Sequence, residues 1–577
     1  MRVLLLYPPQ QAWYGPHLGL PSLTAFLRRA GLEVRQRDLN QELNRRLLAP
    51  RWLARALARA RERARRGGPL PATFAPALGW AEAAQERVVE ALPGALAVLR
   101  DPARLADDAA LAQAFGTLGE AYALFSIGWH PTAVGSSLQL PANPCCAAEV
   151  LAAVADERHN PYRELYREEV LPELLADPWQ PDLIGLGLTY EEQLVPGLTL
   201  AKLLGEALPE TPLVLGGALL SRLLPAFRRA GRFPAAFAPA AHVVVHEGET
   251  ALLRLCEALD SRRPPGPELP NLLSPLPGGG LQLGPALQED VATLPTPDFG
   301  GLVLRDYLLA EPILPLLTSR GCYWGRCGFC THHGGYGEQG GYRARPVAQV
   351  ADDLATLRRR DGARVVYLVD EAVPLRNLRA VARANREGGL GLGWFGDVRL
   401  ERGLTRALLD ELRAGGCQML IFGQESGSQA SLDRMGKGIT VDQARRILRD
   451  ATAAGIFTVG MFFIGFPGET LLDAERTRRF LEEERAHLGA WGLGAFSLLE
   501  GSPAFRRPAD HGITWIGAEP ADGELGNRYA YRLRQGIDEG SAGRIAEAIR
   551  RRLGAEEAPA SLFPRELHAL RRTFAAG

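Results

Sequence analysis

The sequence predicts an α/β protein made of two successive series of strand–helix units. Short apolar runs such as residues 3–7 recur along the chain, and stretches with helical periodicity follow them. A segment rich in proline and glycine, residues 260–300, separates the two series and reads as a linker or extended strap. With 577 residues the chain exceeds what one hydrophobic core supports, so we expect several domains.

The first series predicts a doubly wound, Rossmann-like parallel sheet over residues 1–290. Apolar runs of this kind are typical of strands that are buried on both faces. Right-handed crossovers place the carboxyl ends of such strands along one edge, where a ligand crevice opens. The predicted strands are residues 3–7, 34–38, 183–190, 212–217 and 242–249.

Residues 41–180 interrupt this series. The stretch 41–125 is rich in Ala, Arg and Leu and has almost no strand signal, which is typical of amphipathic helices. Residues 126–180 contain several prolines and one further helical stretch near 164–175. We interpret residues 41–180 as a helical insertion.

The second series predicts a partial, TIM-like (β/α)6 barrel over residues 291–500. Six predicted strands alternate with helical stretches, and the active site of such a barrel lies at the carboxyl ends of its strands. Residues 501–577 are expected to form a mostly helical C-terminal region. The six strands are residues 312–319, 365–370, 392–398, 418–427, 457–469 and 490–500.

Charge and hydropathy argue against several classes of partner. The 66 Lys and Arg residues balance the 66 Asp and Glu residues, so no global field attracts nucleic acid or an anionic membrane. No window approaches the about 18 apolar residues of a membrane span. The first apolar run ends at Pro8, too early for a signal peptide. We therefore expect a cytoplasmic protein without a nucleic-acid partner or a membrane span.

Three of the seven cysteines, Cys322, Cys327 and Cys330, lie on the loop that leaves the first barrel strand. A structural zinc site needs four ligands, and no second Cys or His pair completes one here. His332 and His333 offer a Cys3His zinc site as an alternative, although adjacent histidines point apart. A four-iron cluster with three thiolates explains the missing ligand and leaves one iron open to bind a cofactor or substrate.

This loop, with Phe329 just before the last cysteine, resembles the cysteine loop of the radical S-adenosylmethionine (SAM) superfamily. The usual spacing there is three residues and then two. Here it is four and then two, as in subfamilies with a CYWGxCxFC-like string. The resemblance implies that the three cysteines ligate a [4Fe-4S] cluster whose open iron chelates SAM. One electron, from a donor of the flavodoxin or ferredoxin type, would then release a 5′-deoxyadenosyl radical.

Later strand ends also resemble SAM-binding segments of this superfamily. Asp370 and Glu371 stand where the family carries acceptors for the methionine ammonium group, although the usual Gly-Gly-Glu is not reproduced. The string GQESGS (423–428) resembles a Gly-x-Glu-Ser-Gly motif, and FIGFPGET (463–470) matches another recurrent string. The implied SAM contacts are Phe329, Asp370, Glu371, Gly423, Glu425 and Ser426.

The first series resembles the cobalamin-binding domain that precedes many radical SAM domains. The matching strings include LLYPPQ (5–10), PDLIGLGLTYEEQ (181–193) and VHEGETALLRL (245–255). The Asp-x-His-x-x-Gly motif that supplies a cobalt ligand in some of these domains is absent, so a domain that kept the fold and lost the cofactor stays an alternative. The implied cobalamin contacts are Thr189, Tyr190, Glu191, Gly216, Gly217, Gly248 and Glu249.

These resemblances predict a cobalamin-dependent radical SAM enzyme that methylates an unactivated carbon. One SAM would methylate cobalamin, and a second would generate the radical that activates the substrate. Two alternatives stay open. The first is radical SAM chemistry without methyl transfer, such as rearrangement, cyclisation or epimerisation, and the second is a non-catalytic iron–sulfur or zinc-structured protein. No motif identifies the substrate, whether small molecule or peptide.

Overall fold

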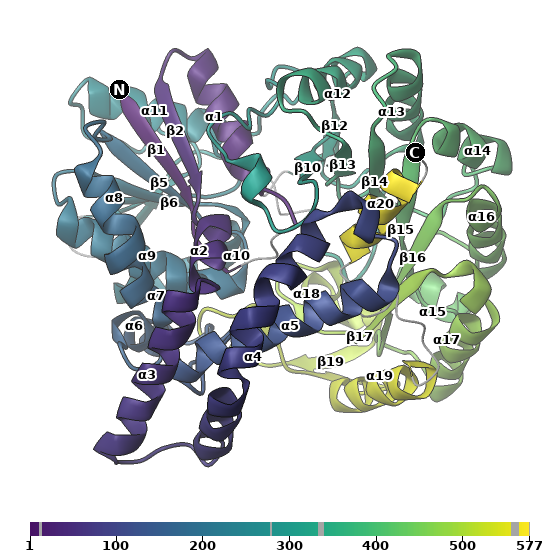
Figure 1. Ribbon diagram of the computed structural model, residues 1–577. Helices are drawn as coiled ribbons and strands as arrows, with labels where there is room; N and C mark the ends of the chain where they lie inside the picture. The colour runs from purple at the N-terminus through teal and green to yellow at the C-terminus, as the bar shows by residue number, and fades with distance from the viewer. Residues whose placement is uncertain (11–13, 277–279, 333–339, 555–564, 576–577) are drawn as a thin grey trace. The chain divides into compact units, whose positions relative to one another are not determined.

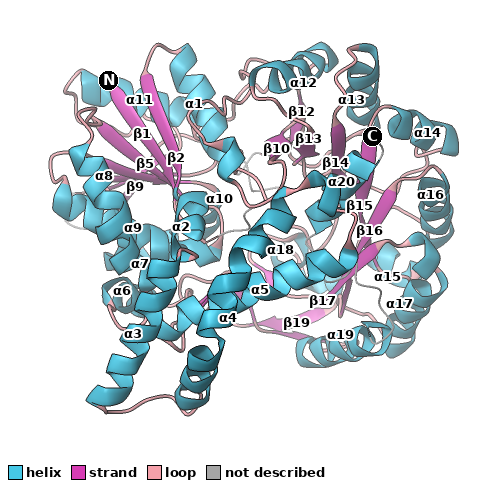
Figure 2. Cartoon of the chain, in the orientation of Figure 1, coloured by secondary structure: helices cyan, strands magenta, loops and turns pink. Residues whose placement is uncertain are grey.

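The structure, a computed structural model, describes residues 1–10, 14–276, 280–332, 340–554 and 565–575. The chain divides into two compact units, and both are α/β (Figures 1 and 2). The first unit contains Met1–Glu289, Pro297–Pro312 and Gly523–Gly526. The second unit contains Asp290–Thr296, Ile313–Asp522 and Asn527–Gly577.

The first unit is built on a seven-stranded sheet with the order β2-β1-β5-β6-β7-β8-β9. Its first five strands pair in parallel, so their carboxyl ends share one edge. This arrangement confirms the predicted Rossmann-like sheet. The strands are β1 (Arg2–Tyr7), β2 (Glu33–Asp38), β5 (Leu183–Gly187), β6 (Leu213–Gly216), β7 (His242–Val244), β8 (Leu272–Pro275) and β9 (Leu281–Leu283).

The last two strands correct the prediction of a linker or strap over residues 260–300. β8 pairs antiparallel with β7, and β9 pairs antiparallel with β8. Leu272 and Leu273 are buried in this pairing. Strands of four and three residues are too short to show a periodicity, so the prolines and glycines around them dominated the sequence signal.

Helices cover both faces of this sheet. On one face, α1 (Gly19–Arg29) and α11 (Glu249–Asp260) pack on the side chains of Val3, Leu5 and Tyr7. On the other face, Leu174 of α8 (Leu171–Ala176) and Leu208, which follows α9 (Leu194–Ala207), share a pocket with Leu4. Alternate β1 side chains therefore point to opposite helical layers, which explains the continuous apolar run of the strand.

The helical insertion belongs to the first unit. Its longest members, α4 and α5, pack along each other (Figure 1). One short antiparallel pair, β3 (Ala133–Val134) with β4 (Leu138–Gln139), interrupts the helices. The helices are α2 (Leu39–Leu47), α3 (Pro50–Arg66), α4 (Phe74–Arg100), α5 (Asp108–Ser126), α6 (Ala147–Ala155), α7 (Pro161–Leu165) and α8.

The second unit is built on a six-stranded parallel sheet with the order β10-β13-β14-β15-β16-β17. The spatial order equals the chain order and every pairing is parallel, as in a barrel, which confirms the predicted partial barrel. The strands are β10 (Ile313–Leu316), β13 (Val365–Leu368), β14 (Gly393–Val398), β15 (Cys417–Glu425), β16 (Phe457–Ile464) and β17 (Ala490–Ala495).

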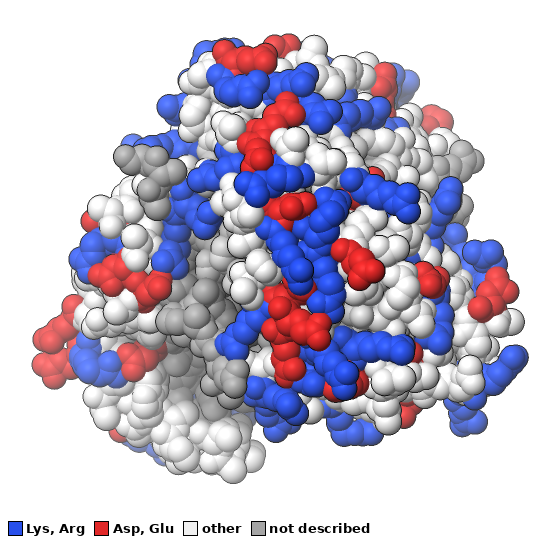
Figure 3. Space-filling view, turned by 90° about the vertical axis from the view of Figure 1, so that its right-hand side faces the viewer, with Lys and Arg blue, Asp and Glu red and all other residues white. Residues whose placement is uncertain are grey.

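Helices connect these strands and carry a mixed-charge surface. Pairs such as Arg383 with Glu411 and Arg445 with Glu483 link neighbouring helices, and Figure 3 shows the two signs intermixed on one face. Such exposed pairs add little stability, but they leave no single-sign field. The helices are α12 (Val347–Arg360), α13 (Leu375–Glu387), α14 (Arg406–Ala414), α15 (Gln429–Arg434), α16 (Val441–Ala453) and α17 (Leu471–Glu483).

The C-terminal region has two parts. Residues just after β17 form short antiparallel pairs, β18 (Leu498–Leu499) with β20 (Arg528–Tyr529) and β19 (Ile513–Ile516) with β21 (Tyr531–Leu533). The helices α18 (Pro503–Arg506), α19 (Glu539–Gly554) and α20 (Arg565–Ala575) account for the predicted helical content.

Helix α20 lies against the amino-terminal ends of the barrel strands. His568 stacks on Phe457 at the start of β16, with ring centroids 4.5 Å apart. The Arg572 guanidinium donates to the Gly455 carbonyl just before that strand. The helix therefore covers the end of the barrel opposite to the one where the cysteine loop emerges.

Among the described residues, no helix combines the length and the apolar character that a membrane crossing requires.

Candidate functional site

The cysteine loop follows β10 and the short strand β11 (Ser319–Arg320). Cys327 is buried, whereas Cys322 and Cys330 are half-buried. Burial raises the pKa of the Cys327 thiol and raises the pKa of Cys330 to about 11. Burial alone therefore disfavours free thiolates here, and a bound metal centre would supply the positive charge that stabilises them.

The geometry does not gather a site for a single ion. In the part of the chain that the structure describes, no three His, Cys, Asp or Glu side chains converge on one metal position. A four-iron cluster needs no such convergence, because each thiolate binds a different iron atom. The Cys3His zinc alternative involves His333, which lies outside the described residues.

Asp370 follows β13 and faces the start of the cysteine loop. Its carboxylate accepts hydrogen bonds from the Thr318 amide at 3.0 Å, from the Thr318 hydroxyl at 2.8 Å and from the Ser319 hydroxyl. Burial raises the pKa of Asp370 to about 6, against the lowering effect of these bonds. Asp370 thus ties the end of β13 to the segment that leads into the cysteines.

Glu371 differs from its neighbour because one of its carboxylate oxygens is buried and has no hydrogen-bond partner among the residues that the structure describes. An unpaired buried acceptor is costly unless a ligand satisfies it. At this strand end, the free oxygen suits an ammonium group. Of the two predicted acceptors, Glu371 is the one left with capacity for a ligand.

Glu425 ends β15 and forms an ion pair with Lys437 at 2.7 Å. Both side chains are nearly buried, and Glu425 has a φ of +67°, which is rare for a residue other than glycine. A Cβ on Gly423 would lie 2.6 Å from a Glu425 carboxylate oxygen, so a larger residue there would displace this pair. The strained end of β15 therefore presents a fixed pair of opposite charges.

Ser426 and Phe329 lie in packed surroundings. Ser426 is fully buried, and its hydroxyl is 3.0 Å from the Thr477 hydroxyl of α17, so its side chain supports the barrel wall. Phe329 packs edge-on against Phe463, with ring centroids 5.0 Å apart, and Lys437 lies 5.9 Å from its ring centroid. Phe329 therefore joins the cysteine loop to β16.

In the first unit, three predicted residues lie at the carboxyl edge of β5. The Thr189 and Tyr190 amides both donate to the Gln193 side chain, at 2.8 and 3.1 Å. The Tyr190 side chain is exposed, whereas Thr189 is half-buried. Glu191 is exposed and pairs with Arg222 at 3.2 Å. The turn after β5 is thus held by its own side chains.

The next strand ends add Gly216, Gly217, Gly248 and Glu249. Gly217 has a φ of +108°, and a Cβ there would lie 2.2 Å from the Leu188 carbonyl oxygen. Gly248 precedes α11, whose first residue, Glu249, is buried. The structure therefore brings the predicted residues to one edge, but Glu249 points into protein rather than solvent.

His17 and Asp38 lie at the same edge, although neither is among the predicted cobalamin contacts. The His17 ring stacks on Tyr7, with centroids 5.0 Å apart, and its Nδ1 accepts from the Gly19 amide at 3.1 Å. Burial lowers the pKa of His17 to about 4, so its ring is neutral. Asp38 ends β2 and accepts from the Tyr307 hydroxyl, and burial raises its pKa to about 6. Only the position after a strand could have marked Asp38.

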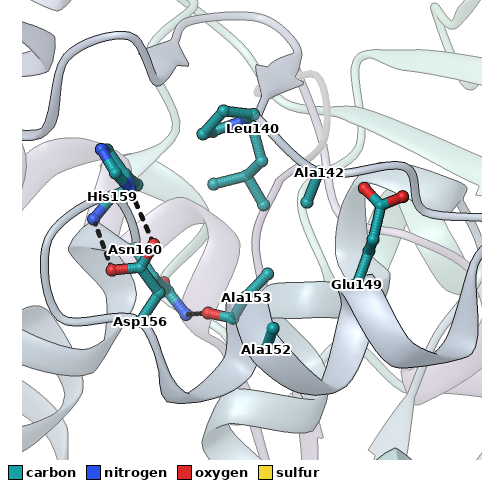
Figure 4. Close-up of a pocket in the computed structure, with 9 residues that line it drawn as sticks. Leu140, Ala142, Glu149, Ala152, Ala153, Asp156, His159 and Asn160 are labelled. Atoms are coloured by element: carbon teal, nitrogen blue, oxygen red, sulfur yellow. Dashed lines mark hydrogen bonds and ion pairs between the residues drawn. The ribbon is translucent and has the colours of Figure 1, made fainter.

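A separate cavity lies in the helical insertion. Its volume is about 320 Å³, and Figure 4 shows Leu140 and Ala142 on one side and the α6 residues Ala152 and Ala153 on the other. Polar residues of the lining interact with each other: His159 pairs with Asp156 at 2.7 Å. None of the predicted site residues lines this cavity.

Comparison with known proteins identifies the second unit. Residues 316–481 match the family model of the Radical SAM superfamily. The chain contains a radical SAM domain. This domain runs from β10 into α17 and includes the cysteine loop, Glu371 and Glu425. The radical SAM prediction is thereby confirmed for residues 316–481, and with it the prediction of an enzyme domain.

Two curated relatives resemble this chain. An uncharacterized methyltransferase of Pyrococcus horikoshii is 30% identical over 42% of this chain. The anaerobic magnesium-protoporphyrin IX monomethyl ester cyclase of Rubrivivax gelatinosus is 24% identical over 44% of this chain. The chain spans about half the length of these relatives, 52% and 46% respectively.

Solved structures extend the likeness beyond the radical SAM domain. The radical SAM methyltransferase TsrM from Kitasatospora setae, with cobalamin and a [4Fe-4S] cluster bound, has a TM-score of 0.56 at 15% identity. The match covers 95% of this chain and 90% of that one. The cobalamin-dependent radical SAM enzyme OxsB, with aqua-cobalamin and SAM bound, has a TM-score of 0.52 at 17% identity and covers 70% of this chain and 63% of that one. At such identities the likeness establishes the fold.

Proposed function

We propose that this chain is a cobalamin-dependent radical SAM methyltransferase that transfers a methyl group to an unactivated carbon. The likeness in fold to TsrM over almost the whole chain supports this proposal, as does the relative that is named a methyltransferase. The substrate is a small molecule or a peptide, and the electron donor is a low-potential protein of the flavodoxin or ferredoxin type.

One observation carries the SAM part of the proposal. Three cysteines on the loop after β10 stand next to the strand end that carries Glu371. Within the described part of the chain, one buried carboxylate oxygen of Glu371 has no hydrogen-bond partner. Thiolates suit an iron–sulfur cluster, and the free oxygen suits the ammonium group of a methionine moiety. Neither feature has an evident structural use without these ligands.

When bound, the cluster supplies the electron that splits SAM into methionine and a 5′-deoxyadenosyl radical, and cobalamin supplies a methyl carrier. Cys322, Cys327 and Cys330 hold the cluster, and Glu371 accepts from the methionine ammonium group. Asp370 fixes the entrance of the loop through Thr318 and Ser319. Phe329 and the pair of Glu425 with Lys437 form the adjoining wall beside Gly423.

In the first unit, cobalamin fits the carboxyl edge of the parallel strands. Half-buried Thr189, exposed Tyr190 and the turn at Gly216 and Gly217 offer backbone and ring surface to a large planar ligand. His17 does not offer a cobalt ligand, because Nδ1 accepts from Gly19 and the proton of the neutral ring is on Nε2. The residues thus fit cobalamin without a histidine ligand.

The test is anaerobic reconstitution of the full chain with iron, sulfide and cobalamin. We expect about four irons per chain, cobalamin absorbance that follows the protein through gel filtration, and 5′-deoxyadenosine on adding SAM and dithionite. Replacing the three loop cysteines with Ala should abolish the product, whereas Cys146→Ala, at the half-buried cysteine outside the loop, should retain it. Absence of 5′-deoxyadenosine from the wild-type protein would refute the proposal.

A second candidate is radical SAM chemistry without methyl transfer, which the similarity to a cyclase favours. It shares the cysteine loop and SAM cleavage, so the same experiment separates the two through cobalamin. A protein that cleaves SAM but does not retain cobalamin supports this candidate. A protein that retains cobalamin and forms methylated cobalamin from SAM supports the methyltransferase.

A further inference from the structure

Arg399 is a buried cation directly after β14 in the second unit. Only 6% of the residue is exposed. Its guanidinium donates to the Lys437 carbonyl at 2.6 Å and lies 4.2 Å from the centroid of the Trp324 ring. Among the residues that the structure describes, no carboxylate pairs with Arg399.

Two other buried cations of this unit are neutralised by carboxylates. Lys437 pairs with Glu425 at 2.7 Å, and Arg345 pairs with Asp353 at 2.9 Å. A buried charge without a partner is costly, whereas a carbonyl and an aromatic ring compensate only part of the lost hydration. Arg399 therefore marks a place where an anion from outside the protein side chains is expected.

The loop thiolates are candidates for that negative charge. The Trp324 ring contacts Arg399, and Trp324 lies between Cys322 and Cys327 in the sequence. Its indole N–H donates to the Gly436 carbonyl at 2.9 Å. The Arg399 guanidinium also lies within electrostatic range of the Cys327 sulfur. The same contact thus fixes the longer arm of the cysteine loop and brings a positive charge to it.

The longer arm is itself shaped to reach Arg399. Gly438 has a φ of +67°, and a Cβ there would lie 2.2 Å from the Trp324 ring. The Gly328 amide donates to the Met435 carbonyl at 2.8 Å. The segment after α15 therefore contacts the cysteine loop on both sides of Cys327. These contacts hold the Trp324 ring against the Arg399 guanidinium.

We propose that Arg399 is the counter-ion of the cluster-bound thiolates and that Trp324 positions it. This inference rests on the proposed function, because it requires a [4Fe-4S] cluster on the three cysteines. Three thiolates on such a cluster leave a net negative charge that grows by one on reduction. Arg399 therefore favours the reduced state and acts as a positioning residue rather than a catalytic one.

The experiment compares wild type with Arg399→Met and Arg399→Lys in reconstituted holoenzyme without SAM. The midpoint potential is measured by a redox titration followed by electron paramagnetic resonance. We expect Arg399→Met to make reduction about tenfold less favourable, which is about 59 mV for one electron. Arg399→Lys should retain most of the potential while losing the planar stacking on Trp324. The control is Arg406→Met, since Arg406 is exposed and paired with Asp410.

A stability measurement separates the counter-ion from a purely structural arginine. Cluster binding should raise the melting temperature of wild type more than that of Arg399→Met, because only wild type gains a partner for its buried cation. If Arg399 had a purely structural role, Arg399→Met would lower the melting temperatures of the cluster-free and the cluster-bound protein equally. The rise in melting temperature on cluster binding would then be the same as in wild type. That result, or an unchanged potential in Arg399→Met, overturns the inference.

Two further outcomes are decisive. If Arg399→Met leaves the potential unchanged but weakens SAM binding, the counter-ion is the SAM carboxylate and the inference fails. If wild type takes up a cluster but forms no 5′-deoxyadenosine, the proposed function fails. The potential, measured without SAM, still tests Arg399. If Arg399→Met does not fold, the neutral variant Arg399→Gln takes its place, with the same expected change in potential.

Discussion

At the strand ends of the second unit, the candidate residues are charged side chains that hold one another in place. Lys437 pairs with Glu425, and its carbonyl accepts a hydrogen bond from Arg399. Asp370 ties β13 to the cysteine loop. At the strand ends of the first unit, the candidates are turns and rings, such as Gly217 and the stack of His17 on Tyr7. Fixed charges suit a small ionic ligand, whereas turns and rings suit a large ligand recognised by shape.

The largest expected effect concerns the turns at the strand ends of the first unit. Gly217→Ala should destabilise the first unit by about 2–5 kcal/mol, because a positive φ costs about 1–2 kcal/mol and the clash with the Leu188 carbonyl must be relieved by backbone movement. The control is Gly231→Ala, whose φ is +64° and whose Cβ would meet nothing within 4 Å. Urea unfolding should show a loss of only about 1–2 kcal/mol for it. Equal losses would contradict the role of Leu188.

The next effect concerns a buried carboxyl in the second unit. Burial raises the pKa of Glu469 from 4.5 to about 7, so the folded unit holds a proton that the unfolded chain releases. Stability from this group is full below about pH 4.5 and is lost as the pH rises through about 7. One pKa unit is about 1.4 kcal/mol, so the loss is up to about 3 kcal/mol.

Glu469→Gln checks this sign. The Gln variant cannot titrate, so its stability relative to wild type should increase between about pH 4.5 and 7 and then level off. Unfolding free energies at several pH values measure the difference. A constant difference across this range would show that Glu469 stays ionised, held by the Gly465 and Phe466 amides that donate to it.

A smaller effect is expected where the clash involves a side chain. Gly438→Ala places its Cβ 2.2 Å from the Trp324 ring, which can shift, so about 1–2 kcal/mol of stability should be lost beyond the backbone strain. The matched control is Gly362→Ala, with a φ of +69° and nothing within 4 Å. Iron content after reconstitution should fall for Gly438→Ala and stay unchanged for the control. Equal iron content in the two variants would show that the position of Trp324 does not affect cluster retention.

The smallest effect tests the free carboxylate. Glu371→Gln should weaken SAM binding to the reconstituted protein about tenfold, or about 1.4 kcal/mol, because a charged acceptor for an ammonium group becomes neutral. Anaerobic titration calorimetry measures this. Glu411→Gln, which removes the half-buried partner of Arg379 and Arg383 on α14, should leave the affinity unchanged. Unchanged affinity in Glu371→Gln would remove Glu371 from the site.

The sequence predicted the elements whose signal is local. The runs at β1 and β13 identify buried strands because both faces are covered, and the cysteine loop is recognisable because its chemistry lies in consecutive residues. The pair β8–β9 was missed because each strand is short and lies between prolines. Where a local pattern is brief, turn residues outweigh it.

The site was predictable to a similar extent. Glu371 and Glu425 could be found because they end apolar runs. Arg399 could not, since one arginine after a strand has the same local pattern whether it meets solvent or, as here, a tryptophan brought from another loop. Ser426 stands in a recognisable string, yet its burial against Thr477 depends on where α17 packs. Contacts between segments that are far apart in the chain decide the surroundings of these residues, and a single sequence does not reveal those contacts.

The position of α20 has a consequence for biosynthesis. This helix covers the amino-terminal ends of strands that are made well before it, and His568 stacks on Phe457 at the start of β16. Because the ribosome delivers the chain from its amino terminus at about 5–20 residues per second, all six barrel strands emerge before their cover does. Until α20 is synthesised, the amino-terminal ends of the barrel strands are accessible to chaperones. The packing of α20 on these ends is therefore a late event in folding.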